Sequence, residues 1–349
     1  MAIGTSRTAR DIAFTLEVKS PKIFENIFLN NGVLVLLGSN GRVKIVRGGN
    51  RFDERVHLGQ NSNVDHRSKF AEIPTDFQNN FQTAQYGQAV ISGAVPINLV
   101  EQDQNMGAQR ISSMTDALIE ELKNTFANKV SDGLMATTSA STDPLSIKEE
   151  LPATAFGSQT RTTGGIARSD YPGTDETAAW QTRYDGTTAD ISAATGIAIV
   201  SNALWSASDS SAKDMQPDIG LVTTGVMAKA SGGGDVLRRY GVNDRLLKLR
   251  YDNLMIGNAA LIADRSAGAK NGFFLNTNFM HAQVLAGSKT QATGSIKVIG
   301  DGATSVPLQV SKPIEADNFL NFTIKAYLVY NVTFGGLKQQ LRMDDLTEA

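Results

Sequence analysis

The sequence of 349 residues contains no cysteine, and this absence removes several kinds of chemistry at once. Without a thiol there is no disulfide, no thiolate metal site and no cysteine nucleophile. Long apolar runs are also missing, because the strongest, Val33 to Leu37, is far shorter than the roughly 20 residues of a membrane-spanning helix. No apolar stretch follows Arg7 and Arg10, so we expect neither a signal peptide nor a membrane partner.

The sequence also lacks an excess of charge of either sign. Lysine and arginine number 33 against 35 for aspartate and glutamate, which leaves a formal net charge of −2. A protein that holds nucleic acid through its phosphates usually carries a basic surplus. The densest basic cluster, from Arg238 to Arg250, is interleaved with Asp235 and Asp244 and is typical of a solvated face. We therefore expect no sequence-specific contact with DNA.

The residue patterns of common active sites are absent as well. No glycine is followed directly by lysine, so there is no phosphate-binding loop of the P-loop type. The three histidines, His57, His66 and His281, are dispersed, and adjacent acids such as Glu149-Glu150 carry no pocket signature. The sequence thus predicts no catalytic residue, no cofactor-binding residue, no cofactor and no metal site. An enzyme is not the expected class.

What the sequence does contain, most clearly, is one long amphipathic segment between about Gln104 and Met135. Apolar residues recur there every three or four positions, which predicts a helix with one buried stripe. Glu101 and Asp103 precede it, at the end where the helix dipole favours negative charge. The predicted stripe consists of Ile111, Met114, Leu118, Leu122, Phe126, Val130 and Leu134.

Shorter helices and alternating strands in the other segments predict an α+β fold. Helices are expected from Ser20-Pro21 to a break near Asn31-Gly32, at 192–206, and at 226–240 with an interruption by three glycines. Strands are expected at 43–45, 55–58, 89–91, 95–100, 218–222, 254–263 and 272–275 and throughout the last third. Residues 137–190 offer few candidates for a core, and Trp180 and Trp205 are expected to be packing residues.

The segment from Gly59 to about Gln82 is polar and aperiodic, and it is longer than most loops in compact domains. Alternation at 55–58 and 70–73 predicts a two-stranded arm within about Gly49 to Tyr86. The mixed charges of this arm suit contacts with a neighbouring subunit, and the candidates are Asp53, Arg55, Asp65, Arg67 and Lys69. A flexible, solvated loop is the plain alternative.

Several short motifs, in their shared order, resemble those of major capsid proteins of tailed bacteriophages with the Hong Kong phage-type capsid fold. The resemblance covers about residues 24 to 335. It rests on Ala84-x-Tyr86, Val95-Pro96-Ile97, Asn105-x-Gly107, Gly164-Gly165-Ile166-x-Arg168-Ser169-x-Tyr171-Pro172, Pro217-Asp218-Ile219-Gly220-Leu221 and Phe273-Phe274-Leu275-Asn276. One departure is that Gly173 to Ala179 separate Tyr171-Pro172 from Trp180, where the subgroup often has tryptophans directly after this pair.

The resemblance implies a particular domain organisation. It implies an N-terminal arm, an extended β-hairpin loop, a peripheral domain with a long spine helix, and an axial domain. On this sequence the expected ranges are 1–45 for the arm and first helix, 46–88 for the extended loop, 89–190 for the peripheral domain with its loop-rich connector, 191–312 for the axial domain, and 313–349 for the closing strands and tail.

The resemblance further implies a structural protein that assembles with copies of itself, as pentamers and hexamers, into an icosahedral head around double-stranded DNA. A portal and a separate scaffolding protein are implied partners, a cement protein is a possible one, and packaged DNA is a neighbour by proximity. The implied location is the virion capsid, after synthesis in a bacterial cytoplasm. Two alternatives stay open: an encapsulin-like compartment shell of the same fold, and a soluble enzyme or surface-binding protein with an unrecognised site.

Overall fold

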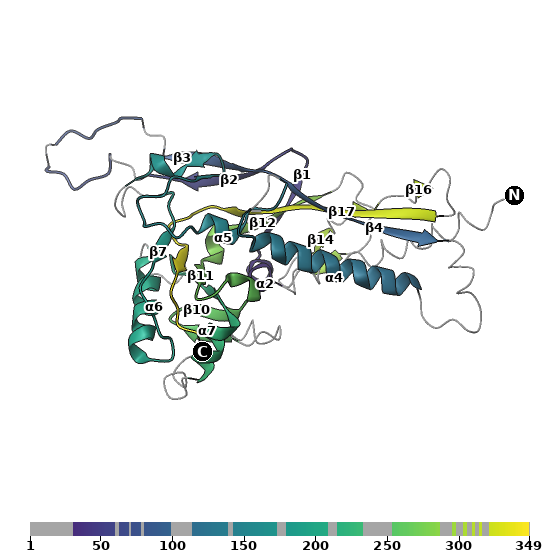
Figure 1. The fold of residues 1–349 in the computed structure, drawn as a ribbon. Coiled ribbons are helices and arrows are strands. Elements are labelled where there is room, and N and C mark those ends of the chain that lie inside the picture. The colour runs from purple at the N-terminus through teal and green to yellow at the C-terminus, as the bar shows by residue number, and fades with distance from the viewer. Residues whose placement is uncertain are drawn as a thin grey trace. The chain divides into compact units, whose positions relative to one another are not determined.

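The computed structural model describes residues 31–59, 63–69, 71–77, 80–98, 114–138, 142–172, 179–208, 215–232, 253–286, 295–297, 303–305, 309–310, 314–315 and 321–348. The chain, drawn in Figure 1 with its colour running from the N-terminus to the C-terminus, divides into two compact units. Each unit is built from separate stretches of sequence. The first unit draws on Met1–Asn50, Gly87–Ser146 and Ala282–Val332. The second draws on Arg51–Tyr86, Ile147–His281 and Thr333–Ala349.

The main sheet of the first unit is organised around β17 (Asn321–Phe334). Strand β4 (Ala89–Asn98) pairs with it in antiparallel register, from Asn321 opposite Asn98 to Tyr330 opposite Ala89. The order also continues from β17 through β12 to β1, and β1 runs parallel to β12. The remaining strands are β1 (Val43–Arg47), β12 (Met280–Ala286), β15 (Gln309–Val310) and β16 (Ile314–Glu315), with a separate pair β13 (Ser295–Lys297) and β14 (Ala303–Ser305).

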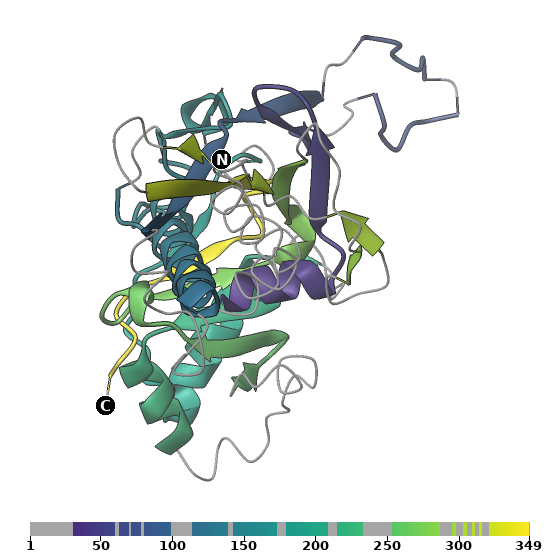
Figure 2. The ribbon, with the colours of Figure 1, turned by 90° about the vertical axis from the view of Figure 1, so that its right-hand side faces the viewer.

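The long helix α4 (Met114–Leu134) packs against β4, as Figure 2 shows from its end. Its buried stripe is the one that the periodicity predicts at Leu122, Phe126, Val130 and Leu134. Contact with the strand is close, because a Cβ on Gly93 would lie 2.5 Å from Leu122 Cδ1 and 2.6 Å from Phe126 Cε2. The predicted start near Gln104 and the side chain of Leu118 lie outside what the structure describes.

Helix α2 (Gly32–Ser39) contains the apolar run that begins at Val33. The sequence predicts a helix break at Asn31-Gly32, and the structure shows a helix beginning there. The Asn31 Oδ1 accepts hydrogen bonds from the backbone N–H groups of Val33, at 3.0 Å, and Leu34, at 3.3 Å. A side-chain oxygen in this position satisfies N–H groups that have no partner within the helix. The predicted helix from Ser20 falls outside the described residues.

The second unit contains a six-stranded sheet in the order β7-β18-β11-β8-β10-β9. Strand β8 is fully buried, pairs parallel to β10 and antiparallel to β11, and thus lies at the centre. A continuous apolar strand such as Ile219-Gly220-Leu221-Val222 is expected where both faces are covered. The strands are β7 (Arg183–Asp185), β8 (Ile219–Val222), β9 (Asn253–Ile256), β10 (Ala259–Ala263), β11 (Gly272–Leu275) and β18 (Leu341–Met343).

Helices α6 (Ala194–Ser206) and α7 (Thr224–Gly232) contribute to the core of this unit, with short 3-10 turns at Arg265–Ala267 and Thr277–Phe279. The predicted helix at 192–206 is confirmed. The predicted strand 254–263 is interrupted, because Gly257 adopts a φ of +62° and turns the chain between β9 and β10. The expectation for Trp205 is wrong: its side chain is 56% exposed. Of the predicted helix 226–240, residues beyond Gly232 lie outside the described part.

The connector that precedes α6 is short in regular structure but rich in buried residues. It contains α5 (Ile147–Glu150), β5 (Thr162–Thr163), β6 (Ile166–Ala167) and a 3-10 turn at Arg168–Asp170. The sequence predicts few core residues here, and that prediction is wrong. Trp180 and Arg168 are the two largest side chains of the described structure that are fully buried.

Candidate functional site

The structure forms an antiparallel hairpin from β2 (Phe52–His57) and β3 (Phe81–Tyr86). Its register places Phe52 opposite Tyr86 and His57 opposite Phe81. Strand β2 alternates strictly, with Phe52, Glu54 and Val56 buried and the intervening residues exposed. The two-stranded arm predicted within Gly49 to Tyr86 is therefore present.

The predicted pairing within this arm is wrong in one respect. Residues 70–73 were the expected second strand, but β2 pairs with Phe81–Tyr86 instead. Within 71–73 the backbone has no regular structure and the side chains are exposed. Alternation over four residues is a local pattern, and it carries no information about which distant segment supplies the partner strand.

The outward face of the hairpin carries charged and aromatic side chains. The Arg55 guanidinium lies 4.8 Å from the centre of the Phe81 ring, and the His57 and Phe81 rings are 4.7 Å apart. Arg51 Nη1 donates a hydrogen bond of 2.6 Å to Gln85 Oε1. Two of the predicted contact residues, Asp53 and Arg55, lie on this exposed face of β2.

The other three predicted contact residues, Asp65, Arg67 and Lys69, lie in the loop between the strands, and all three are exposed. Both ribbon views show the described parts of this loop extending past the ends of β2 and β3 (Figures 1 and 2). The loop has internal hydrogen bonds: Asn63 Nδ2 donates to the Asp76 carbonyl at 2.8 Å, and Arg67 Nη1 donates to the Glu72 carbonyl at 3.3 Å.

Three apolar side chains on this loop are exposed, and they are not among the contact residues predicted from the sequence. Val64 is 78% exposed, Ile73 is 70% exposed, and Phe77 is fully exposed. Single exposed apolar residues are common on protein surfaces, whereas several on one projecting loop are typical of a surface that a partner covers. Their only signal in the sequence is the presence of large apolar residues in a segment without periodicity.

The base of the hairpin is fixed by buried polar contacts. Tyr86 is buried and its hydroxyl donates a hydrogen bond of 2.8 Å to the Phe334 carbonyl. Burial raises the pKa of Tyr86 far above its usual value, so the hydroxyl remains a neutral donor. Glu54 Oε2, on the buried face of β2, lies 3.3 Å from His281 Nδ1.

The turn between β5 and β6 also contacts this base. Gly164 and Gly165 have φ angles of +59° and +77°, the geometry of a tight two-residue turn. The Gly164 carbonyl accepts a hydrogen bond of 2.8 Å from the backbone N–H of Gln85 in β3. A Cβ on Gly164 would lie 2.7 Å from the Ala84 Cβ, so only glycine fits here.

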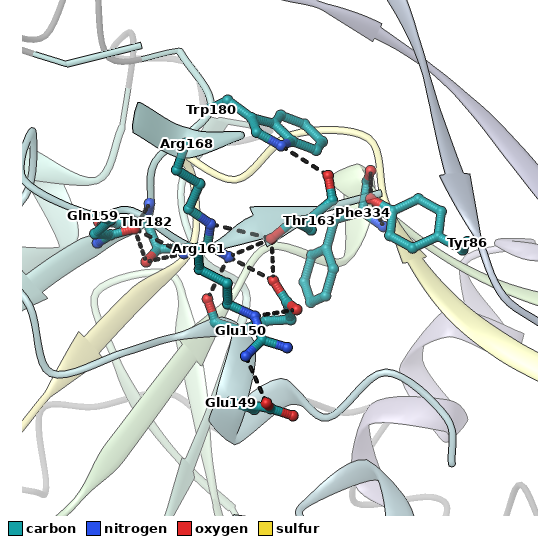
Figure 3. A network of polar contacts seen from close by, with 10 residues as sticks. All are labelled: Tyr86, Glu149, Glu150, Gln159, Arg161, Thr163, Arg168, Trp180, Thr182 and Phe334. Carbon is teal, nitrogen blue, oxygen red and sulfur yellow. Dashed lines mark hydrogen bonds and ion pairs between the residues drawn. The ribbon is translucent and has the colours of Figure 1, made fainter. Parts of the chain in front are cut away.

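Behind this turn lies a buried ion pair between Arg168 and Glu150, shown in Figure 3. Arg168 Nη2 is 2.6 Å from Glu150 Oε2, and both side chains are completely buried. The same guanidinium donates hydrogen bonds to Thr163 Oγ1, Gln159 Oε1 and the Glu150 carbonyl. Thr163 in turn donates its hydroxyl to Glu150 Oε2 at 2.5 Å, and Trp180 Nε1 donates to the Thr163 carbonyl at 3.2 Å.

A second arginine extends the network toward the surface. Arg161 Nε contacts Glu150 at 2.8 Å and its Nη1 contacts Glu149 at 2.6 Å. Burial lowers the pKa of Arg161, but its bonds to Glu149 and Glu150 outweigh burial and raise it overall. Burial also lowers the pKa of Arg168, and the ion pair with Glu150 opposes that shift. The adjacent acids Glu149 and Glu150, which carry no pocket signature in the sequence, both bind Arg161.

This network consists of paired charges and satisfied hydrogen bonds, which is the arrangement of a structural site. In the part of the chain that the structure describes, no group of three or more histidines and acidic residues could hold a metal ion. None of the described helices is long and apolar enough to cross a membrane. The arrangement can hold the base of the hairpin in one geometry.

Comparison with known proteins identifies the fold. No family model matches the chain, and no curated protein sequence matches it. The structure is similar to a chain of the Cyanophage A-1(L) capsid asymmetric unit, with a TM-score of 0.63 and 13% identity, over 92% of this chain and 94% of that chain. The chain therefore has the mixed α+β Hong Kong phage-type capsid fold that its motifs implied.

Two further solved structures are similar at a lower level. One is the holo-SrpI encapsulin complex from Synechococcus elongatus, with a TM-score of 0.48 and 8% identity over 87% of this chain and 85% of that chain. The other is the capsid of an empty GTA particle, with a TM-score of 0.49 and 10% identity over 87% and 94%.

Proposed function

We propose that this chain is the major capsid protein of a tailed bacteriophage and that it assembles, as pentamers and hexamers, into an icosahedral head around double-stranded DNA. The observation that carries the proposal is the similarity to a cyanophage capsid chain along almost the whole length of both chains. Head-to-tail contacts around a ring generate closed assemblies of this kind.

The hairpin supplies the proposed contact between subunits. Covering the exposed apolar residues Val64, Ile73 and Phe77 by a neighbouring subunit would favour association, because burial removes their apolar surface from water. The charged residues Asp53, Arg55, Asp65, Arg67 and Lys69 are the proposed polar contacts. Each exposed ion pair contributes only about 0–1 kcal/mol. The charges therefore determine how neighbouring subunits align, and the stability of the shell comes from the many copies of each contact.

The partners follow from the proposed assembly. A portal and a separate scaffolding protein are proposed, together with a possible cement protein, and packaged DNA lies near the shell without base-specific contacts. We propose that assembly takes place in the bacterial cytoplasm and that the product is the virion capsid. The division into arm, extended loop, peripheral domain, axial domain and closing strands, with the ranges given above, belongs to this proposal.

Assembly is tested directly with the purified chain. We expect light scattering, with scaffolding protein supplied, to show particles far larger than a dimer. Only monomers and dimers under those conditions would contradict the proposal and favour a soluble enzyme or surface-binding protein. The content of the particles separates the remaining shell functions, because a phage head holds DNA and an encapsulin-like compartment holds protein cargo.

Deleting Asn61 to Asp76 is expected to leave a subunit that folds and does not close a shell. The deletion spares β2 and β3, whose pairing ends at His57 and Phe81, and removes most of the loop between them. Circular dichroism measures folding and electron microscopy measures shells. A deleted protein that closes normal shells would make the loop passive, whereas one that does not fold would place the loop in the core.

A matched variant keeps the length of the loop and removes only the three apolar side chains that are exposed in the described part of it. Val64, Ile73 and Phe77 are all replaced by serine in one variant. We expect this variant to fold like the parent and to lose closed shells as the deletion does. If it closes shells at the parental yield, covering of these apolar groups is not the driving force.

A further inference from the structure

A chain of contacts runs from the buried Arg168–Glu150 pair to the projecting hairpin. Thr163 is the link, because its hydroxyl donates to Glu150 Oε2 and accepts from Arg168 Nε and Nη2 (Figure 3). The next residue, Gly164, accepts the hydrogen bond from the Gln85 N–H of β3. The ion pair is therefore connected to strand β3 of the hairpin by the hydrogen bonds of Thr163, the peptide link to Gly164 and the hydrogen bond from Gln85.

The turn that makes this link has little freedom to move. Its backbone is held between the buried Thr163 side chain on one side and Ala84 and Tyr86 on the other. Trp180 fixes the Thr163 carbonyl from a third direction. A shift of the turn would break a buried hydrogen bond or force Gly164 into Ala84, and both outcomes are unfavourable.

The ion pair is a costly way to fill this space, because both charges lose their hydration when buried. An apolar pair of similar volume is often as stable, but it would not define one geometry for Thr163. A fully hydrogen-bonded polar network does define a single geometry for Thr163, because each hydrogen bond forms only over a narrow range of atomic positions. This difference indicates that the ion pair determines the direction of the β2–β3 hairpin in addition to stabilising the fold.

We propose that Glu150, Thr163 and Arg168 form a positioning site that fixes the direction of the β2–β3 hairpin through the Gly164 turn. The inference rests on the proposed function, because the direction of the hairpin matters for reaching a neighbouring subunit. These residues are themselves buried within the subunit. They affect assembly through the contact of the turn with β3. In a variant that loosens the turn, the hairpin is still folded but extends in a different direction.

The first readout is hydrogen exchange at the Gln85 amide, which is bonded to Gly164 and so reports on the turn directly. Thr163→Val keeps the size of the side chain and removes the hydroxyl link. We expect exchange at Gln85 to be about tenfold faster, with the amides of β8 unchanged, as for a local opening. Val200→Ala, in the buried core of α6, is the matched control: it should lower the melting temperature without changing exchange at Gln85.

The second readout is the yield of closed shells relative to the loss of melting temperature. Thr163→Val removes the hydrogen bonds between the turn and the ion pair, and Gly164→Ala adds a methyl group on the side of the turn that contacts Ala84. We expect both variants to reduce the yield of closed shells about tenfold, and we expect the Val200→Ala control to keep the parental yield. Parental exchange at Gln85 in Thr163→Val, or equal shell loss in the control, would overturn the proposal. If the parent itself forms no shells, the proposed function fails, and exchange at Gln85 alone decides the positioning role.

Discussion

Replacing Arg168 with methionine is expected to lower the free energy of unfolding by about 3–5 kcal/mol, the usual loss when one partner of a buried ion pair is removed. Glu150 would lose its fully buried charged partner, with Arg161 and Thr163 as its remaining partners. Gln159 Oε1 would also lose the donor that binds it at 2.8 Å. The loss combines a weakened ion pairing of Glu150 with the removal of one of the hydrogen bonds that Gln159 Oε1 accepts, since the bonds from Thr182 remain.

A double variant separates this cause from a simple loss of packing. When Glu150→Met is added to Arg168→Met, the buried charge disappears together with its partner, and apolar pairs in such positions are often nearly neutral. Denaturant unfolding should therefore show a smaller loss for the double variant than for Arg168→Met alone. An equal or larger loss of unfolding free energy in the double variant would show that Arg168 and Glu150 stabilise the protein through packing and not through their charges.

Replacing Phe126 with aspartate is expected to cost several kcal/mol and to leave the protein insoluble or unassembled, because an unpaired charge enters an apolar contact. Phe126 is 2% exposed on α4, in the stripe that faces β4. Its ring closely approaches Gly93, so the carboxylate would replace a close apolar contact. The same result is expected for Leu118→Asp if the predicted stripe extends to that residue.

The control for this prediction is Asn128→Asp, an exposed position on the same helix. It adds the same charge without burying it, so soluble yield and the helical circular dichroism signal should match the parent. A normal yield of soluble, helical protein from Phe126→Asp would mean that the stripe does not pack as the structure shows.

The elements that could be predicted from the sequence are those with a strong local period. The stripe at Leu122, Phe126 and Val130 repeats every four residues and identifies α4 and its buried face. Strand β17 alternates at Ala326 and Leu328, and it too is identified from one stretch of sequence. In both cases the burial of the residues follows from their own spacing.

The support of the hairpin could not be predicted in this way. Glu150, Thr163 and Arg168 are polar residues with no periodic spacing, and they are buried because they satisfy one another. Such pairing depends on a tertiary arrangement that sequence patterns do not contain. The partner strand Phe81–Tyr86 was missed for a related reason, since its buried face shows only Ala84 and Tyr86.

Negative-stain electron microscopy of the purified chain, with scaffolding protein supplied, tests the central claim most directly. We expect rings of five and six subunits and closed shells of uniform size from the full chain. We expect the variant lacking Asn61 to Asp76 to yield subunits or rings without closed shells. A preparation of the full chain that contains only isolated, stable monomers would contradict the claim that this protein builds a shell.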